Sequence, residues 1–241
     1  MTTVAGAQAA YPSSNAESYA HVERKGFAVF MLVGPLILLG ATIIHPAHGV
    51  RATSGVSYYT AAYNHTTRFY IAHTLFFFTA VTLSVAVVGL TRLIRPTNPK
   101  RAFWGLVFSV MGFVGWGAID GIDFMTYIAG AHKSLNTNTM QQYINYVVAD
   151  NPVLIPVTAI FTLLIIALVW IALAMHSAGI APLWLGLLLP IGVTGVISFL
   201  NIPVLEIASG LCVCAAVIPV GIRQLRAPDE PEPVQAAAPA A

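Results

Sequence analysis

The stretch that decides the fold is residues 102–129, AFWGLVFSVMGFVGWGAIDGIDFMTYIA, in which the only charged residues are Asp120 and Asp123. About 20 consecutive apolar residues are enough for a helix to cross the hydrocarbon core of a bilayer. The segment therefore predicts a transmembrane helix, and an unusual one, because it carries two acids within the apolar run.

The composition of the whole chain points the same way. Of its 241 residues, 57% are hydrophobic and only 8% are charged, whereas soluble domains carry about 25% charged residues. A water-facing surface cannot be built from so few charges, which excludes a soluble fold. The net charge of +2 comes with no basic stripe, so a nucleic-acid partner is also excluded.

The apolar segments predict an all-α, polytopic membrane bundle of six transmembrane helices. A single transmembrane domain is expected over residues 23–226, between a flexible tail at 1–22 and a disordered tail at 227–241, which is rich in proline, alanine and acid. Asn201 and Pro203 separate the last two segments. We place the six spans at 27–46, 71–94, 102–129, 153–175, 181–200 and 202–222.

The basic residues predict the orientation. Cytoplasmic loops of membrane proteins carry an excess of lysine and arginine. With both termini inside, the inner side carries most of the basic residues, which favours an N-in, C-in protein of the plasma membrane. The inner group is Arg24, Lys25, Arg92, Arg95, Lys100, Arg101, Arg223 and Arg226, and the outer group is Arg51, Arg68 and Lys133.

Two features stand out in the predicted outer loops. The first loop is rich in aromatic residues, which we interpret as a belt at the headgroup level: Tyr58, Tyr59, Tyr63, Phe69 and Tyr70. The second loop has the spacing of a short amphipathic helix behind caps at Thr137 or Asn138. We interpret that helix as an interfacial anchor, with a lid over a site as the alternative. Its apolar positions are Met140, Tyr143, Ile144, Val147 and Val148.

Ionisable side chains gather in the outer half of the predicted bundle. Asp120 and Asp123 lie in the outer half of the third span, and Glu206 lies near the outer start of the sixth. His45 and His73 lie near the outer ends of the first and second spans. A charged group at the centre of a membrane helix costs about 2.5 to 3.5 kcal/mol, and such residues usually mark functional positions.

The two aspartates are three residues apart and therefore share one helical face. Gly117 and Gly121 lie beside them in a GxxxG pattern, which predicts a close approach by a neighbouring helix. Two poorly hydrated carboxylates would not both stay ionised near neutral pH without a cation nearby. We expect His73 or His45 to be that partner, with Glu206 across a cavity. The alternative is that Trp116, Tyr127 or a threonine satisfies each acid.

The predicted site is thus an outward-facing pocket for a lipophilic small molecule. Acid–base chemistry such as isomerisation or cyclisation is the first interpretation. The predicted catalytic residues are Asp120, Asp123, Glu206 and His73, and the predicted pocket residues are Phe77, Trp116, Phe124 and Tyr127.

Two other classes of function stay open. The first is a redox protein that binds a haem or a divalent metal, for which His45, His48 and His73 are the candidate metal ligands. No HExxH motif is present, and His73 alone lies well inside a span, so the sequence assigns no cofactor. The second is a non-catalytic accessory subunit that binds another membrane protein or a second copy of itself, with membrane lipid around it.

Overall fold

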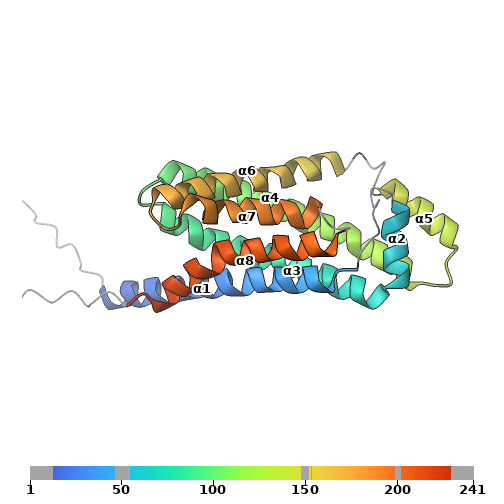
Figure 1. Ribbon diagram of the computed structural model, residues 1–241, viewed down its shortest axis with the longest axis horizontal. Coiled ribbons are helices and arrows are strands. Elements are labelled where there is room, and N and C mark those ends of the chain that lie inside the picture. Colours follow the sequence, from blue (N-terminus) through green and yellow to red (C-terminus); the bar gives the residue numbers. More distant parts are fainter. Residues whose placement is uncertain (1–12, 47–54, 148–151, 153, 199–201, 229–241) are drawn as a thin grey trace, which may run out of the picture.

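The described part of the chain folds into α-helices joined by turns (Figure 1). The computed structural model describes residues 13–46, 55–147, 152, 154–198 and 202–228. The predicted tail residues 1–12 and 229–241, together with His48 and Val148, lie outside this range. The helices are α1 (Ser13–Ile44), α2 (Gly55–Asn64), α3 (Thr66–Ile94), α4 (Pro99–Ala131), α5 (Thr137–Asn145), α6 (Leu154–Ser177), α7 (Leu183–Ser198) and α8 (Pro203–Arg226).

Within the described residues, the five long helices and the shorter α7 form a closed ring. Helix α1 packs on α3 and α8, α4 packs on α3 and α6, and α7 packs on α6 and α8. Short connections place successive helices next to each other, as in other helical bundles. The contact between α8 and α1 closes the ring, and this arrangement confirms the predicted all-α bundle.

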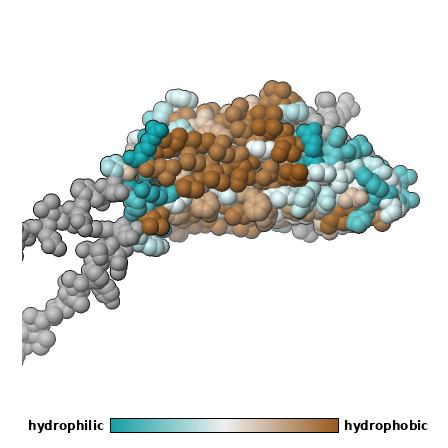
Figure 2. Space-filling view, turned by 90° about the horizontal axis from the view of Figure 1, so that it is seen from below, coloured by the Kyte–Doolittle hydropathy of each residue, from teal (hydrophilic) through white to brown (hydrophobic). Residues whose placement is uncertain are grey.

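The bundle has the length and surface of a multi-pass membrane protein. Within the described residues, α1, α3, α4, α6 and α8 are long and apolar enough to cross a membrane. On the face drawn in Figure 2, hydrophobic side chains cover the middle of the molecule and hydrophilic side chains lie at both ends. Helix α1 begins at Ser13, earlier than the predicted span, so its first turns extend into the segment expected to be a flexible tail.

Helix α7 is the exception among the predicted spans. It has 16 residues, about 24 Å at 1.5 Å per residue, which is less than the roughly 30 Å of a hydrocarbon core. The guanidinium group of Arg24 donates to the carbonyl oxygens of Ala227 and Pro228 at 3.2 and 3.3 Å. The N-terminal part of α1 and the C-terminal end of α8 therefore lie at the same end of the bundle. An odd number of crossings would separate those ends. Short as it is, α7 therefore supplies the sixth passage through the bundle.

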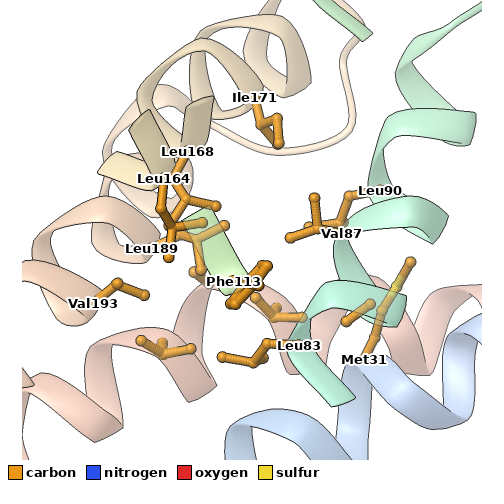
Figure 3. Close-up of a cluster of buried hydrophobic side chains, with 14 of the residues drawn as sticks. Met31, Leu83, Val87, Leu90, Phe113, Leu164, Leu168, Ile171, Leu189 and Val193 are labelled. Carbon is orange, nitrogen blue, oxygen red and sulfur yellow. The ribbon is translucent and has the colours of Figure 1, made fainter. Parts of the chain in front are cut away.

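A continuous apolar core fills most of the ring. Phe113 of α4 lies at its centre, among Leu83 of α3, Leu164 of α6 and Leu189 of α7 (Figure 3). Leu164 is fully buried. Such packing leaves little freedom for helices to shift, because interiors are packed as densely as organic crystals.

Glycines on α4 allow a close approach to α6, but they are Gly112 and Gly115 and not the expected Gly117 and Gly121. A Cβ atom at Gly112 would lie 2.3 Å from Cβ of Leu164, and one at Gly115 would lie 3.1 Å from the backbone nitrogen of Phe161. The prediction that Gly117 and Gly121 admit a neighbour was wrong. A Cβ at Gly117 would meet only Phe77, at 3.9 Å, and one at Gly121 would meet nothing within 4 Å.

Helices α2 and α5 form a cap at one end of the bundle (Figure 1). Helix α5 packs on α2, where Ile144 joins a buried cluster with Tyr59 and Ala129. The amphipathic helix is thus present, but its apolar face covers α2. Its N-cap is Asn136, whose side chain accepts a hydrogen bond from the Thr139 backbone at 3.0 Å. The predicted caps were therefore one or two residues late.

The aromatic belt predicted for the first outer loop was wrong for two of its members. Tyr59 is 1% exposed and Phe69 is fully buried, because α2 and the first turns of α3 fold against the bundle. Tyr70 remains exposed on the outside of α3. The side chain of Tyr58 lies outside the described residues.

The glycine contacts predict opposite effects for two substitutions on α4. Gly112→Ala forces a clash with Leu164 and is expected to destabilise the protein by about 1 to 3 kcal/mol. Gly121→Ala fills open space and adds helix propensity, so it is expected to be neutral or stabilising by up to about 1 kcal/mol. Thermal unfolding in detergent would measure both, and equal effects of the two variants would contradict this packing.

The contact between Arg24 and the residues after α8 predicts which parts of the chain lie on the same side of the membrane. In a variant without the native cysteines, Arg101→Cys and Arg226→Cys are expected to react with an impermeant thiol reagent from the same side. Ser134→Cys, in the turn between α4 and α5, is expected to react only from the opposite side. Labelling of all three from one side of sealed vesicles would contradict the six passages.

Candidate functional site

Five ionisable side chains are buried in the half of the bundle nearest to α2 and α5. They are at most 6% exposed, and the other buried polar side chains in the described part of the chain are serines and threonines. The five come from four helices that are neighbours in the ring: His45 directly after α1, His73 on α3, Asp120 and Asp123 on α4, and Glu206 on α8.

His45 pairs with Glu206. The Nδ1 atom of His45 lies 3.1 Å from Oε1 and 3.2 Å from Oε2 of Glu206. Glu206 is in the first turn of α8 and only 1% exposed, so it neither reaches toward water nor stands alone. The expectation that Glu206 faces the aspartates across a cavity was wrong, because the pair with His45 joins α8 to α1 instead.

His73 pairs with Asp123. Of the two histidines expected as partners of the aspartates, His73 and His45, it is His73 that contacts one of them. The Nδ1 atom of His73 lies 2.8 Å from the carbonyl oxygen of Phe69. Because a carbonyl can only accept, Nδ1 carries a hydrogen, and the ring is held in one orientation. Its Nε2 atom then lies 3.5 Å from Oδ2 of Asp123. The Phe69 ring stacks on the imidazole at 4.0 Å between centroids.

The two histidine–acid pairs touch each other. The ring centroids of His45 and His73 lie 5.2 Å apart in an edge contact, and Phe76 packs against both rings. The structure therefore places four ionisable groups in the order Glu206, His45, His73 and Asp123, across α8, α1, α3 and α4. A sequence can suggest such partners but not their order.

Asp120 lies at the free end of this row, beside a small apolar cavity. Asp123 follows it by three residues on α4, and Trp116, one turn earlier on the same helix, lines the same cavity. The Oδ2 atom of Asp120 is buried without a hydrogen-bond partner among the described residues. Buried polar atoms are rarely left without a partner, so an atom in this state requires an explanation, of which a catalytic role is one. The cavity holds about 90 Å³ and is lined by His73, Phe76, Trp116, Ile119, Asp120, Asp123, Phe161, Val196 and Ile197.

The lining of this cavity differs from the predicted pocket. Trp116 lines it, but Phe77, Phe124 and Tyr127 do not. Those three belong to an aromatic group on the outside of α3 and α4, where the Tyr70 and Tyr127 rings are 4.8 Å apart. Trp116, Asp120 and Asp123 are four and three residues apart and face one way. Tyr127 shares this face but lies one turn beyond Asp123, where it packs on the cluster that contains Phe69. Sequence reasoning also missed the apolar lining residues Ile119, Phe161, Val196 and Ile197.

The candidate metal ligands are not assembled into a site by the described residues. No group of three or more histidine, cysteine, aspartate or glutamate side chains in that part of the chain is arranged to hold a metal ion. Both ring nitrogens of His73 are directed at protein atoms. His48, the third predicted ligand, lies outside the described residues.

Comparisons with protein-family models, with curated proteins and with solved structures found no match. The fold nevertheless defines a class, since the chain is a multi-pass helical membrane protein. Its described residues include a buried row of two histidine–acid pairs beside an apolar cavity. Any more specific function has to be argued from that row and that cavity.

The His45–Glu206 pair predicts that, in a double-mutant cycle, the second substitution restores part of the stability that the first one removes. His45→Leu or Glu206→Leu alone leaves one buried group unpaired, which is expected to destabilise the protein by about 3 to 5 kcal/mol. The double variant replaces the pair with apolar side chains and is expected to be more stable than either single variant. Thermal unfolding in detergent would measure all three.

The control cycle uses Glu23 and Arg92, an ion pair with side chains 25% and 50% exposed. Its coupling is expected to stay below about 1 kcal/mol. Additive effects of His45→Leu and Glu206→Leu would show that the two side chains are not partners.

Proposed function

We propose that this protein is a plasma-membrane protein, with both termini inside, that performs acid–base chemistry on a lipophilic small molecule. The observation that carries the proposal is the unpartnered Oδ2 atom of Asp120 in an apolar cavity, next to the His73–Asp123 pair. An acid and a base thus border one space from which most water is excluded.

In this proposal Asp120, in its protonated form, donates a proton to one atom of the ligand. The His73–Asp123 pair removes a proton from a neighbouring atom, so the ligand is isomerised with no net change in its protons. The proton then returns to Asp120 from the adjacent pair. The Phe69 carbonyl holds the His73 ring in place for this step, and His45 with Glu206 supports it from behind.

The size of the cavity favours isomerisation over cyclisation. An apolar cavity of about 150 Å³ is known to hold benzene, and this one has about 90 Å³. It can therefore admit the reacting end of a molecule but not a whole folded isoprenoid chain. The rest of the ligand would lie along Ile197, which is 36% exposed, toward the surrounding lipid.

A second candidate function is that of a non-catalytic subunit in a membrane complex or oligomer. The observation that favours it is that the two pairs join α1 to α8 and α3 to α4. Buried polar pairs in membrane bundles can serve to specify helix contacts alone. The two proposals differ in one respect, because only the first requires Asp120 to exchange a proton with a ligand.

The acid–base proposal predicts deuterium transfer from solvent to a lipophilic molecule. The purified protein is incubated in D₂O with the total lipid extract of the membranes in which it was produced, and mass spectrometry follows each species. At least one species is expected to gain deuterium over a protein-free sample. Asp120→Asn is expected to slow this exchange by about 10²-fold or more.

Glu23→Gln, which removes an acid at the opposite end of the bundle, is the matched control and should exchange like the unmodified chain. An exchange rate unaffected by Asp120→Asn would contradict the role of Asp120. If no species gains deuterium although the protein is folded, the subunit proposal is the one that stands.

A further inference from the structure

A second cavity lies at the opposite end of the bundle from the acid–histidine row. It is bounded by the last turns of α3 and the first turns of α4, and holds about 340 Å³. Its polar end is formed by Arg92 and Arg95, and its apolar wall by Val88, Ala102, Phe103 and Leu106. A cavity with two arginines at one end and hydrocarbon side chains at the other matches an amphipathic anion.

The two arginines are in different electrostatic situations. Arg92 forms an ion pair with Glu23, and its guanidinium group lies over the Phe27 ring, 4.9 Å from the centroid. Arg95 makes no side-chain hydrogen bond or ion pair with any described residue. Lys100 and Arg101 are exposed nearby on α4. Among the described residues at this edge, positive charge therefore exceeds negative charge. Of the two arginines that line the cavity, Arg95 is the one left to bind a ligand.

The apolar wall faces the membrane. Phe103 is 58% exposed and Trp104 is 47% exposed, and aromatic side chains of this kind gather at the headgroup level of membrane proteins. Leu106 lines the cavity about one turn further along α4, toward the middle of that helix. The arginines thus lie at the headgroup level, and the apolar wall runs from them toward the bilayer core.

We propose that this cavity binds an anionic glycerophospholipid, with its phosphate on Arg95 beside Arg92 and one acyl chain along Phe103 and Leu106. Arginine pairs with phosphate through two parallel hydrogen bonds. Basic pockets between transmembrane helices are a common way to hold anionic headgroups. A soluble anion would use only the arginines, whereas a phospholipid also covers the exposed apolar wall. This proposal is independent of the acid–base function.

The test measures lipid binding to the full chain in neutral detergent. Phosphatidylglycerol and phosphatidylcholine with identical acyl chains are titrated separately, with binding read by native mass spectrometry and by the thermal unfolding midpoint. Phosphatidylglycerol is expected to bind more tightly and to raise the midpoint more. Arg95→Gln is expected to weaken phosphatidylglycerol binding by about tenfold, as expected for the loss of a charge-assisted hydrogen bond.

Arg101→Gln is the matched control, because it removes one exposed cation at the same end from a residue that does not line the cavity. It should leave phosphatidylglycerol affinity nearly unchanged, and Arg95→Lys should restore part of the affinity lost in Arg95→Gln. Leu106→Trp should lower affinity by filling the apolar end.

Three results would overturn the proposal. They are equal binding of the two lipids, equal losses in Arg95→Gln and Arg101→Gln, and displacement of phosphatidylglycerol by inorganic phosphate at similar concentrations. The last result would identify a site for a free anion. Unfolding midpoints of the variants without added lipid show that each is folded before binding is compared.

Discussion

The pairing of ionisable groups inside the membrane is the constraint on which the rest of this structure depends. An isolated charge in hydrocarbon is too costly to keep, so each buried acid needs a partner from another helix or a change of protonation. Glu206 of α8 pairs with His45, and Asp123 of α4 pairs with His73. Because these pairs bring α8 to α1 and α4 to α3, the same contacts that neutralise the acids also set which helices lie side by side at that end.

Close packing elsewhere in the ring supports this arrangement. Gly112 brings α4 against Leu164 of α6, and the core around Phe113 fills the space between them. The polar row is thereby confined to one half of the bundle. At its end Asp120 borders the cavity, with a buried Oδ2 atom that has no hydrogen-bond partner among the described residues. A structural role explains the two pairs. It does not explain why a third acid lines an apolar space with an oxygen directed at no protein group.

The two ends of the bundle differ in chemistry. One end carries the buried acids and histidines under the α2 and α5 cap, and the other carries exposed arginines around Phe103 and Trp104. The first arrangement can handle protons away from water, while the second offers cations at the level of lipid headgroups. The two proposals made above place an anionic lipid at one end and proton transfer at the other. On the face drawn in Figure 2, hydrophobic side chains lie between these two ends.

The sequence by itself determined the helical membrane fold, the approximate spans and the half of the bundle in which Asp120, Asp123 and Glu206 lie, because hydropathy and helical rise depend only on local order along the chain. It also predicted the amphipathic helix at Met140 and Ile144. Only the tertiary structure decided that Glu206 pairs with His45, that Gly112 is the contact glycine, and that Phe161 and Val196 line the cavity. These depend on how each helix is rotated about its axis. In an all-apolar bundle that rotation is set by packing between helices, for which a single hydrophobic sequence carries almost no signal.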